Sequence, residues 1–243
     1  MELQGRVGIV TGGGVRVGRA IALGLARSGV DVFIHYNRSA EPAERTAEEA
    51  RELGVRAAVG SVNLSDPTNA AALVDLAKRS LGTPSILVNS ASGFPSDTIA
   101  DVTVDAWRAT LDLTLASPVF ATQAFANALP EDLDGAVVNI TDVRTRTPYR
   151  AHFSYIVAKG GIDTFTKTAA LQLAPRIRVN AVALGVILPP PQEDDDYAVR
   201  LATDLPLGRV GGTGPVVTTV LSLLENDFIT GEIVRVDGGG HLV

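Results

Sequence analysis

The sequence contains no cysteine among its 243 residues. The chain can therefore form neither disulfide bonds nor thiolate metal sites, and catalysis by a cysteine nucleophile is excluded. Histidine is scarce as well, because the three histidines, His35, His152 and His241, are scattered along the chain. A histidine-rich metal site is not expected, and we predict no bound metal.

Positive charge is also in short supply, with 21 Lys and Arg against 27 Asp and Glu and a formal net charge of −6. This balance argues against a nucleic acid or an anionic membrane as a partner, and a local cluster of cations must hold any anionic ligand. No apolar run approaches the ~20 residues that a membrane span needs, and the first residues show no signal-peptide pattern. We therefore expect a cytoplasmic protein that acts on a small molecule.

Short apolar runs alternate with helical stretches along the whole chain. The predicted strands cover 7–10, 31–35, 55–59, 86–89, 136–140, 177–182 and 232–236. The predicted helices cover 18–28, 41–53, 105–129 and 153–173, and Pro67 opens another behind an Asp66 cap. Continuous apolar strands that alternate with helices are typical of a mostly parallel sheet covered on both faces. We therefore predict an α/β fold over 1–243, a single-domain, doubly wound Rossmann fold with a seven-stranded sheet.

The stretch over 188–204 interrupts this alternation. It contains three consecutive prolines, and these are followed by Glu193, Asp194, Asp195 and Asp196. A solvated surface loop and a mobile lid over the substrate are both consistent with this composition, since lids come from poorly packed segments near the mouth of a site.

A glycine-rich turn joins the first predicted strand to the first predicted helix over 11–18. Glycines let the backbone turn sharply and approach a pyrophosphate, and the start of the helix offers free N–H groups and the positive end of a dipole. A plain chain reversal would gain little from the cation at Arg16. We therefore predict a dinucleotide-binding turn in which Gly12, Arg16 and Val17 contact the cofactor.

The end of the second predicted strand indicates which cofactor is bound. Folds that prefer NAD usually place a carboxylate there to bond the ribose 2′-hydroxyl. This chain has no carboxylate at that point, and the predicted cofactor contacts are His35, Asn37, Arg38 and Ser39. Arg38 and Ser39 can hold a 2′-phosphate through charge-assisted hydrogen bonds, whereas the alternative makes Arg38 a solvated turn residue. We predict a preference for NADPH over NADH.

Further residues follow other predicted strands at the same edge of the sheet. An open α/β sheet places its ligand crevice at this edge, beyond the carboxyl ends of the strands. Each residue alone is a weak signal, because polar residues also cap helices and form turns. The predicted cofactor contacts here are Asn63, Leu64, Asn89, Ser90, Ala91, Gly185 and Val186.

Tyr155 and Lys159 are four residues apart in the long predicted helix, so their side chains share one face. A free tyrosine has a pKa near ~10, too high for easy proton exchange at neutral pH. A lysine charge at ~4 Å is worth up to ~4 kcal/mol at an effective dielectric of ~20, about three pKa units before desolvation is subtracted. We therefore predict that Lys159 makes Tyr155 a working general acid; the alternative is a surface pair with no chemical role.

The whole chain resembles the short-chain dehydrogenase/reductase family through the glycine-rich turn, Asn89 at a strand end, the Tyr155–Lys159 pair and a terminal Asp237-Gly238-Gly239. In that family the tyrosine donates the proton and the lysine also bonds the nicotinamide ribose. The resemblance implies these roles here, together with a homotetramer in which long helices pair. An apolar stripe on the long predicted helix fits such pairing and core packing equally well, and it consists of Ala158, Ile162, Phe165, Ala169 and Leu173.

Three features make the chain similar to the pteridine reductase branch of this family. They are Arg16 in the turn, the His-Tyr-x-Arg-Ser end of the second strand, and Asp142 in place of the usual serine. In that branch the pterin ring stacks between the nicotinamide and an aromatic residue just beyond the fourth strand, a position that Phe94 matches. The resemblance implies a substrate site made of Arg16, Phe94, Asp142 and Tyr155.

The chemistry of Asp142 suits a pterin. A carboxylate accepts hydrogen bonds from the amide and amino groups of the ring that a serine hydroxyl would serve less well. Beside Tyr155 it can also feed a proton into the reduction of a C=N bond, whereas the alternative makes it a strand-end cap. We name Asp142, Tyr155 and Lys159 as catalytic. The leading prediction is an NADPH-dependent reductase of a pterin or dihydrofolate-like ring.

Two other functions stay open. A ketone or 3-oxoacyl reductase would use the same Tyr155 and Lys159, but a carbonyl oxygen needs donors and an ionised Asp142 donates nothing. The third is an NADP-binding regulator with little catalysis, because two family positions differ here. Thr114 stands where an asparagine usually holds a water of the proton relay, and Leu184 replaces a proline near the nicotinamide.

Overall fold

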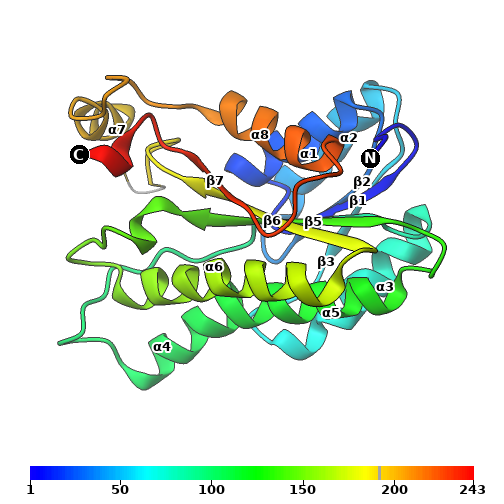
Figure 1. Ribbon diagram of the computed structural model, residues 1–243, viewed down its shortest axis with the longest axis horizontal. Helices are drawn as coiled ribbons and strands as arrows, with labels where there is room; N and C mark the ends of the chain where they lie inside the picture. The colour runs from blue at the N-terminus through cyan, green and yellow to red at the C-terminus, as the bar shows by residue number, and fades with distance from the viewer. Residues whose placement is uncertain (191–192) are drawn as a thin grey trace.

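A parallel sheet in the order β3-β2-β1-β4-β5-β6-β7 runs through the middle of the molecule (Figure 1). The computed structural model describes residues 1–190 and 193–243. All neighbouring strands pair in parallel. The predicted doubly wound, seven-stranded α/β fold is therefore confirmed. The strands are β1 (Val7–Val10), β2 (Asp31–Tyr36), β3 (Ala57–Ser61), β4 (Ile86–Asn89), β5 (Gly135–Asp142), β6 (Ile177–Leu184) and β7 (Ile233–Val236).

Helices cover both faces of the sheet (Figure 1). One face carries α1 (Arg16–Arg27), α2 (Ala40–Glu52) and α8 (Thr213–Glu225). The other face carries α3 (Ala70–Leu81), α5 (Ser117–Ala128) and α6 (Phe153–Leu173). Successive strand residues point to opposite faces, so Val10 and Ile34 lie in one core while Ile9 and Phe33 lie in the other. Burial on both faces explains why the strands read as continuous apolar runs.

The long helix α6 uses its apolar stripe within the chain. Ala158, Ile162 and Ala169 are buried, and Phe165 and Leu173 pack against the core on this face of the sheet. Of the two interpretations that the sequence allows, the stripe is therefore core packing. Among the helices of residues 1–190 and 193–243, none is long and apolar enough to cross a membrane.

The helix predicted over 105–129 is continuous in space but changes type. It consists of α4 (Val104–Leu111), a π-helical turn (Asp112–Ala116) and α5. The N–H of Ser117 donates to the carbonyl of Asp112, the spacing of a π-helix. Pro118 follows in the first turn of α5 and has no N–H to give to the carbonyl of Thr114, which favours the wider turn. The periodicity of apolar residues does not reveal such a change.

The irregular segment predicted over 188–204 contains a helix, α7 (Asp195–Ala202). Residues 191 and 192 of this segment lie outside the described ranges. The carboxylate of Asp194 caps α7 by accepting from the N–H of Tyr197 at 2.8 Å, and Ala198 and Ala202 are buried. The helix lies at one end of the sheet, close to the C-terminus (Figure 1). Part of the acidic run 193–196 is therefore the start of helix α7.

Candidate active site

The glycine-rich turn lies between β1 and α1, as predicted. Gly12 has a φ of +65°, a left-handed conformation that favours glycine, and its N–H donates to Nδ1 of His35 at 3.1 Å. The N-terminus of α1 has no side-chain cap and no acidic residue in its first turn. Its free N–H groups and the positive end of its dipole are available for an anion, so the turn fits the pyrophosphate of a dinucleotide.

His35 supports this turn from behind. Its Nε2 lies 2.8 Å from the carbonyl of Val62, which can only accept, so Nε2 carries the proton and Nδ1 accepts from Gly12. The residue is only 2% exposed, and burial lowers the pKa of His35. We predicted a cofactor contact at His35. Its ring fixes the backbone of the turn through Gly12, and the residue also lines the cavity described below.

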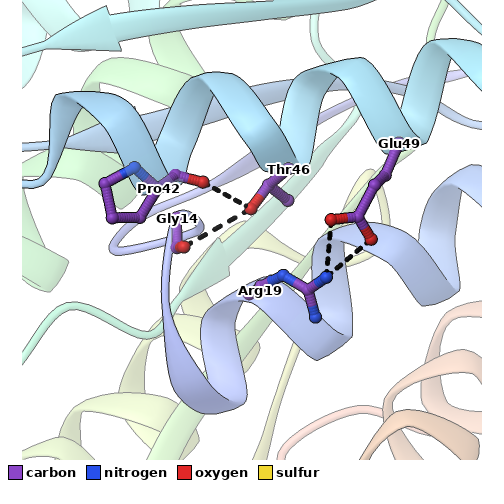
Figure 2. Close-up of polar contacts among 5 residues, drawn as sticks. All are labelled: Gly14, Arg19, Pro42, Thr46 and Glu49. Atoms are coloured by element: carbon purple, nitrogen blue, oxygen red, sulfur yellow. Dashed lines mark hydrogen bonds and ion pairs between the residues drawn. The ribbon is translucent and has the colours of Figure 1, made fainter.

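Helix α2 lies over the same turn and is tied to it by polar contacts (Figure 2). The hydroxyl of Thr46 donates to the carbonyl of Pro42 at 2.8 Å and lies 3.4 Å from the carbonyl of Gly14. Arg19 of α1 pairs with Glu49 of α2 at 2.6 Å. These contacts place the start of α2 beside the turn, and no local sequence pattern indicated them.

A cavity of about 380 Å³ opens between the turn and the start of α2. Arg38 is exposed and forms no ion pair with any side chain in the described ranges. Ser39 precedes α2 without capping it through its side chain, so its hydroxyl and the first N–H groups of the helix are free. A free cation and free donors at a helix start fit the 2′-phosphate of NADPH. The lining includes five residues predicted as contacts, Gly12, His35, Asn37, Arg38 and Ser39, and five that were not, Gly14, Val15, Tyr36, Ser65 and Leu113.

The end of β4 is held against the glycine-rich turn by Thr11, which the sequence analysis did not single out. Its Oγ1 accepts hydrogen bonds from the N–H groups of Ser90 and Ala91 at 2.9 and 3.0 Å. A Cβ on Gly12 would lie only 3.2 Å from the Cα of Ala91. The predicted residues Ser90 and Ala91 therefore lie against the glycine-rich turn. A hydroxyl directly before such a turn was the signal for Thr11.

Three other predicted cofactor residues use their side chains in the core or in a loop. The amide of Asn89 donates to Oδ1 of Asn139 at 2.8 Å inside the core, and the side chain of Leu64 is buried. Oδ1 of Asn63 accepts from the N–H of Ser65 at 3.1 Å, and it is Ser65 that lines the cavity. The core therefore engages the side chains of Asn89 and Leu64, and the loop engages Oδ1 of Asn63.

The remaining predicted cofactor residues lie at helix and strand ends. Val17 packs against the core from the first turn of α1. Gly185 follows β6, and its N–H donates to the carbonyl of Val236 at 3.0 Å. A Cβ on Gly185 would lie 2.6 Å from the Cα of Asp237, so glycine is required for this close approach. Val186 comes next in the chain, and its carbonyl accepts from the N–H of Gly211 at 2.9 Å.

The two central residues of the predicted chemistry meet as expected. The hydroxyl of Tyr155 donates to Oδ2 of Asp142 at 3.0 Å, and Oδ1 of Asp142 accepts from the N–H of Arg144 at 2.8 Å. Asp142 ends β5 and Tyr155 lies in the first turn of α6, so the strand end faces the helix start. Burial raises the pKa of Asp142, although the Arg144 N–H and the Tyr155 hydroxyl oppose this.

Lys159 has a different effect on Tyr155 from the one predicted. Its Nζ donates to the carbonyl of Ile140 at 2.7 Å and lies 5.6 Å from the centre of the Tyr155 ring. The residue is 3% exposed, and burial lowers the pKa of Lys159 to about 8. Burial and the carboxylate of Asp142 raise the pKa of Tyr155 well above its usual value. The expected lowering by Lys159 alone is wrong for this arrangement, because Asp142 is nearer and desolvation dominates.

The two positions that differ from the family pattern also lie at this site. Thr114 sits in the π-helical turn, is 1% exposed, and places its hydroxyl oxygen 3.4 Å from that of Ser92. Leu184 ends β6 and pairs in register with Asp142. Thr114 therefore lies beside Ser92, and Leu184 lies beside Asp142.

An aromatic wall stands beside Tyr155. Phe94 is 40% exposed, and its ring contacts the edge of Tyr155 with centroids 4.8 Å apart. His152 stacks on Phe94 with centroids 3.9 Å apart, and Tyr149 meets His152 edge-on at 5.7 Å. We predicted Phe94 but not His152 or Tyr149. The signal for both was their place within six residues before Tyr155.

The loop that carries Phe94 is clamped to the first turn of α6. Nδ1 of His152 donates to the carbonyl of Pro95 at 2.7 Å, and the carboxylate of Asp97 accepts from the N–H of Ser154 at 3.1 Å and from its hydroxyl. His152 itself has a φ of +61° and provides no side-chain cap for the helix. Asp97 therefore caps α6 from a distance, so the aromatic wall and Tyr155 belong to one unit.

Arg16 connects the glycine-rich turn to the far side of the site. Its φ is +53°, and its guanidinium donates to the carbonyl of Pro189, at the start of the segment 188–204. The side chain thus spans from the proposed cofactor cradle to the predicted lid. The predicted roles of Arg16 toward the cofactor and the substrate stay predictions.

Comparison with known proteins gives matches along nearly the whole chain. A family model described as Enoyl-(Acyl carrier protein) reductase matches residues 14–241. The 3-oxoacyl-[acyl-carrier-protein] reductase FabG of Staphylococcus aureus is 29% identical over 239 residues, which cover 96% of this chain and 97% of the relative.

Two crystal structures of FolM alternative dihydrofolate reductase 1, both with NADP, are also similar. The Brucella canis structure is 36% identical, with a TM-score of 0.95, and the match covers 100% of this chain and 96% of that one. The Brucella suis structure is 37% identical, with a TM-score of 0.94, and the match covers 100% of this chain and 97% of that one.

Proposed function

The chain belongs to the short-chain dehydrogenase/reductase family, and from this premise we propose that it is an NADPH-dependent reductase of a pterin or dihydrofolate-like ring. One observation carries the proposal: the carboxylate of Asp142 lies 3.0 Å from the Tyr155 hydroxyl, where the family usually has a serine. A carboxylate there can accept from the N–H groups of a pterin ring. The Brucella relatives named as alternative dihydrofolate reductases support the same substrate class.

We assign the cofactor to the cavity over the glycine-rich turn. Arg38 and Ser39 hold the 2′-phosphate, and the first turn of α1 with Gly12 holds the pyrophosphate. NADPH supplies the hydride when bound. Lys159 bonds the nicotinamide ribose, as the family resemblance implies. Its Nζ donates to the Ile140 carbonyl and has further N–H groups for the ribose. Further backbone contacts come from Val17, Asn63, Leu64, Asn89, Ser90, Ala91, Gly185 and Val186.

Protons come from the Asp142–Tyr155 pair. Because burial raises the pKa of Asp142, this carboxyl keeps its proton to a higher pH than an ordinary aspartate. A protonated Asp142 can donate to a ring nitrogen, and the Tyr155 hydroxyl relays a proton through the same hydrogen bond. The raised pKa of Tyr155 keeps the phenol protonated between turnovers.

The aromatic wall holds the flat ring of the substrate. Phe94 is 40% exposed beside Tyr155, so an aromatic side chain is accessible there to a flat heterocycle, while His152 stacks on one face of its ring. We further propose that the segment 188–204 acts as a lid and that Arg16 holds its near end through Pro189. Removal of water by such a lid would strengthen the hydrogen bonds of Asp142 to the ring.

A 3-oxoacyl reductase is the second candidate, because the FabG relative matches over nearly the full chain. It would use the same Tyr155 and Lys159. Asp142 favours the first candidate, because the family usually has a serine at this position and a carboxylate can accept from the N–H groups of a pterin, which a carbonyl substrate lacks. A third candidate, an NADP-binding regulator, predicts tight cofactor binding with no turnover of either substrate class.

One assay separates these functions. NADPH consumption is measured side by side with dihydrobiopterin, dihydrofolate, several ketones and a 3-oxoacyl thioester. We expect turnover of the pterins with kcat/KM at least about tenfold above that of any carbonyl compound. Preference for a carbonyl would support the second candidate. NADPH binding without turnover on the whole panel would support the third.

Two further expectations of the sequence stay predictions. The family resemblance implies a homotetramer with paired long helices, which light scattering on the purified protein tests. A cytoplasmic location is tested by fractionation of cells that express the full chain. Neither bears on the chemistry that we assign to Asp142 and Tyr155.

A further inference from the structure

Asp163 lies one turn beyond Lys159 in α6, and the proposed ring reduction does not use it. Tyr155, Lys159 and Asp163 follow one another at intervals of four residues, so they share one face of the helix. That face meets the end of β5, where Tyr155 bonds Asp142 and Lys159 bonds the carbonyl of Ile140. Asp163 therefore faces the strand end that carries the proposed proton donor.

The two carboxylate oxygens of Asp163 bind hydroxyl groups on either side of Asp142. Oδ1 accepts from the hydroxyl of Thr141 at 2.7 Å, and Oδ2 accepts from that of Thr145 at 2.7 Å. This length is typical of a strong hydrogen bond from a hydroxyl to a carboxylate. Thr141 precedes Asp142 in β5, and Thr145 ends the 3-10 turn (Val143–Thr145) that follows it. One side chain thus joins the strand to the turn across Asp142.

The same turn fixes the direction of the Asp142 carboxylate. The N–H of Arg144, inside the turn, donates to Oδ1 of Asp142 at 2.8 Å. The bond that closes the turn, from the N–H of Arg146 to the carbonyl of Val143, is 3.3 Å long and thus longer than usual. The place of the Arg144 N–H therefore depends on the anchor that Asp163 provides.

The surroundings of this turn are polar. A cavity of about 260 Å³ lies beside it, and its lining includes Thr145 and Asp163 together with Arg146, Lys167 and Glu232. The last three side chains are charged and exposed, and such side chains do not pack as a core. Hydrogen bonds rather than apolar packing therefore hold this side of the turn.

We infer that Asp163 is a positioning residue for the reaction: its two hydrogen bonds hold the end of β5 and the following turn so that the carboxylate of Asp142 stays directed at the Tyr155 hydroxyl. The inference rests on the proposed function, because it assumes that Asp142 acts on the substrate ring. Asp163 acts through Asp142 and not on the ring itself. A shift of a reacting group by about 1 Å can cost about a hundredfold in rate, so these bonds affect turnover.

Asp163→Ala and Asp163→Asn test the role. Alanine removes both hydrogen bonds. The asparagine amide can accept from the hydroxyl of Thr145 and donate to the oxygen of Thr141, whose hydroxyl can turn to the carbonyl of Lys159, 3.3 Å away. The substrate is dihydrobiopterin or dihydrofolate, whichever the wild type reduces faster. We expect Asp163→Ala to lower kcat about tenfold, with KM and NADPH affinity changed less than about twofold, and Asp163→Asn to restore most of kcat.

The asparagine variant also separates position from charge. Burial lowers the pKa of Lys159, and the charges of Asp142 and then Asp163 raise it. Loss of charge alone would therefore be felt at Lys159 in both variants. If Asp163→Asn loses as much kcat as Asp163→Ala, the charge matters and the positioning role is overturned.

Hydrogen exchange measures the position of the turn without a substrate. The N–H of Arg144 is followed by NMR in the NADP-loaded protein, because this group bonds Asp142 directly. Its exchange should be at least about tenfold faster in Asp163→Ala and near that of the wild type in Asp163→Asn. Unchanged exchange in Asp163→Ala overturns the inference even if neither pterin is reduced and the proposed function fails. Faster exchange with wild-type kcat overturns it too, because the two bonds would then be purely structural.

Thr145→Val breaks one of the two bonds with little change of shape, and it decides the case if Asp163→Ala folds poorly. It should lower kcat about threefold. Combined with Asp163→Ala it should add no further loss, because both changes remove the same contact, whereas independent losses would contradict the inference. Thr168→Val is the matched control. Its exposed hydroxyl donates within α6 to the carbonyl of Thr164 at 3.0 Å, so kcat and the exchange of Arg144 should stay unchanged.

Discussion

The hydroxyl of Tyr155 donates a hydrogen bond to Oδ2 of Asp142 across 3.0 Å, from the start of one helix to the end of one strand. The two groups are thirteen residues apart in the sequence. Burial raises the pKa of both, and the carboxylate further raises that of the phenol. The carboxyl therefore keeps its proton to a higher pH than an ordinary aspartate, and the phenol keeps its proton to a higher pH than an ordinary tyrosine.

This relationship predicts a pH profile. The proton donor is the neutral form of Asp142, so kcat/KM for a dihydropterin should be highest below the raised pKa of Asp142 and fall as pH rises through it. Asp142→Asn cannot titrate at this position and cannot supply the proton. We expect it to lose about a hundredfold in kcat/KM and to show no fall in this pH range. Stopped-flow rates of NADPH oxidation across pH 4 to 9 check this.

Asp142→Ser restores the residue that the family usually has. It should lose most pterin reduction while NADPH affinity stays near that of the wild type, because the carboxylate contacts Tyr155 and Arg144 rather than the cofactor cavity. Unchanged pterin reduction in this variant would refute the role of Asp142.

The free guanidinium of Arg38 predicts the cofactor preference. Arg38→Gln removes the charge proposed to meet the 2′-phosphate, while the start of α2 stays uncapped and in place. Loss of one charge-assisted contact should weaken NADPH binding by about tenfold or more and change NADH binding little. Titration of the cofactors by fluorescence gives both dissociation constants.

The control for Arg38 is Arg45→Gln, in the same helix start but paired with Glu41 on the surface. It should leave both affinities unchanged. Equal NADPH and NADH affinities in the wild type would contradict the assignment of the 2′-phosphate.

The fold followed from the sequence because the inner strands are buried on both faces and the helices on one. Val10 packs in the core on one face of the sheet and Ile9 in the core on the other, so both positions are apolar and the run is continuous. The π-helical turn at Thr114 was missed because a single wider turn leaves the apolar spacing intact. Helix α7 was missed because its acidic start reads as a solvated run until Asp194 is seen to cap it.

The site was predicted where residues act locally or through family motifs, and missed where they act at long range. Tyr155 and Asp142 were found by spacing, but the contact of His152 with Pro95 joins residues 57 apart in the sequence. The pKa of Tyr155 was predicted with the wrong direction, because the i,i+4 pattern shows Lys159 and does not show burial. The spacing of two residues in one helix shows that they are neighbours. It does not show which residues of the sheet lie beside them or how deeply they are buried.

The clamp between the Phe94 loop and α6 predicts a positioning role for Asp97. Asp97→Ala removes the acceptor for the N–H and the hydroxyl of Ser154, next to Tyr155. Substrate kcat/KM should fall about tenfold while NADPH affinity holds, and the free energy of unfolding should drop by about 1–3 kcal/mol.

Asp97→Asn keeps a carbonyl oxygen for the Ser154 N–H and should restore much of the substrate kcat/KM. The measurements are steady-state kinetics and denaturant unfolding on both variants. A loss of stability with wild-type substrate kinetics in Asp97→Ala would make the clamp purely structural.

Lys159 predicts how stability depends on pH at the alkaline end. Its pKa is about 8 in the folded protein against 10.5 for an ordinary lysine, because it is fully buried. A lowered lysine pKa means that the folded state binds the proton less readily than the unfolded state. Relative to Lys159→Met, which cannot titrate, the wild type should lose about 3 kcal/mol of unfolding free energy as pH falls from about 10.5 to about 8.

Below about pH 8 the lysine is charged in both states, so the difference between the wild type and Lys159→Met should become constant. Lys167→Met, on the exposed side of the same helix, is the control and should show no such slope. Urea unfolding at several pH values between 7.5 and 10.5 measures all three proteins. A constant difference over this whole range would mean that Lys159 is not buried as a cation, and its contact with the Ile140 carbonyl would then need another explanation.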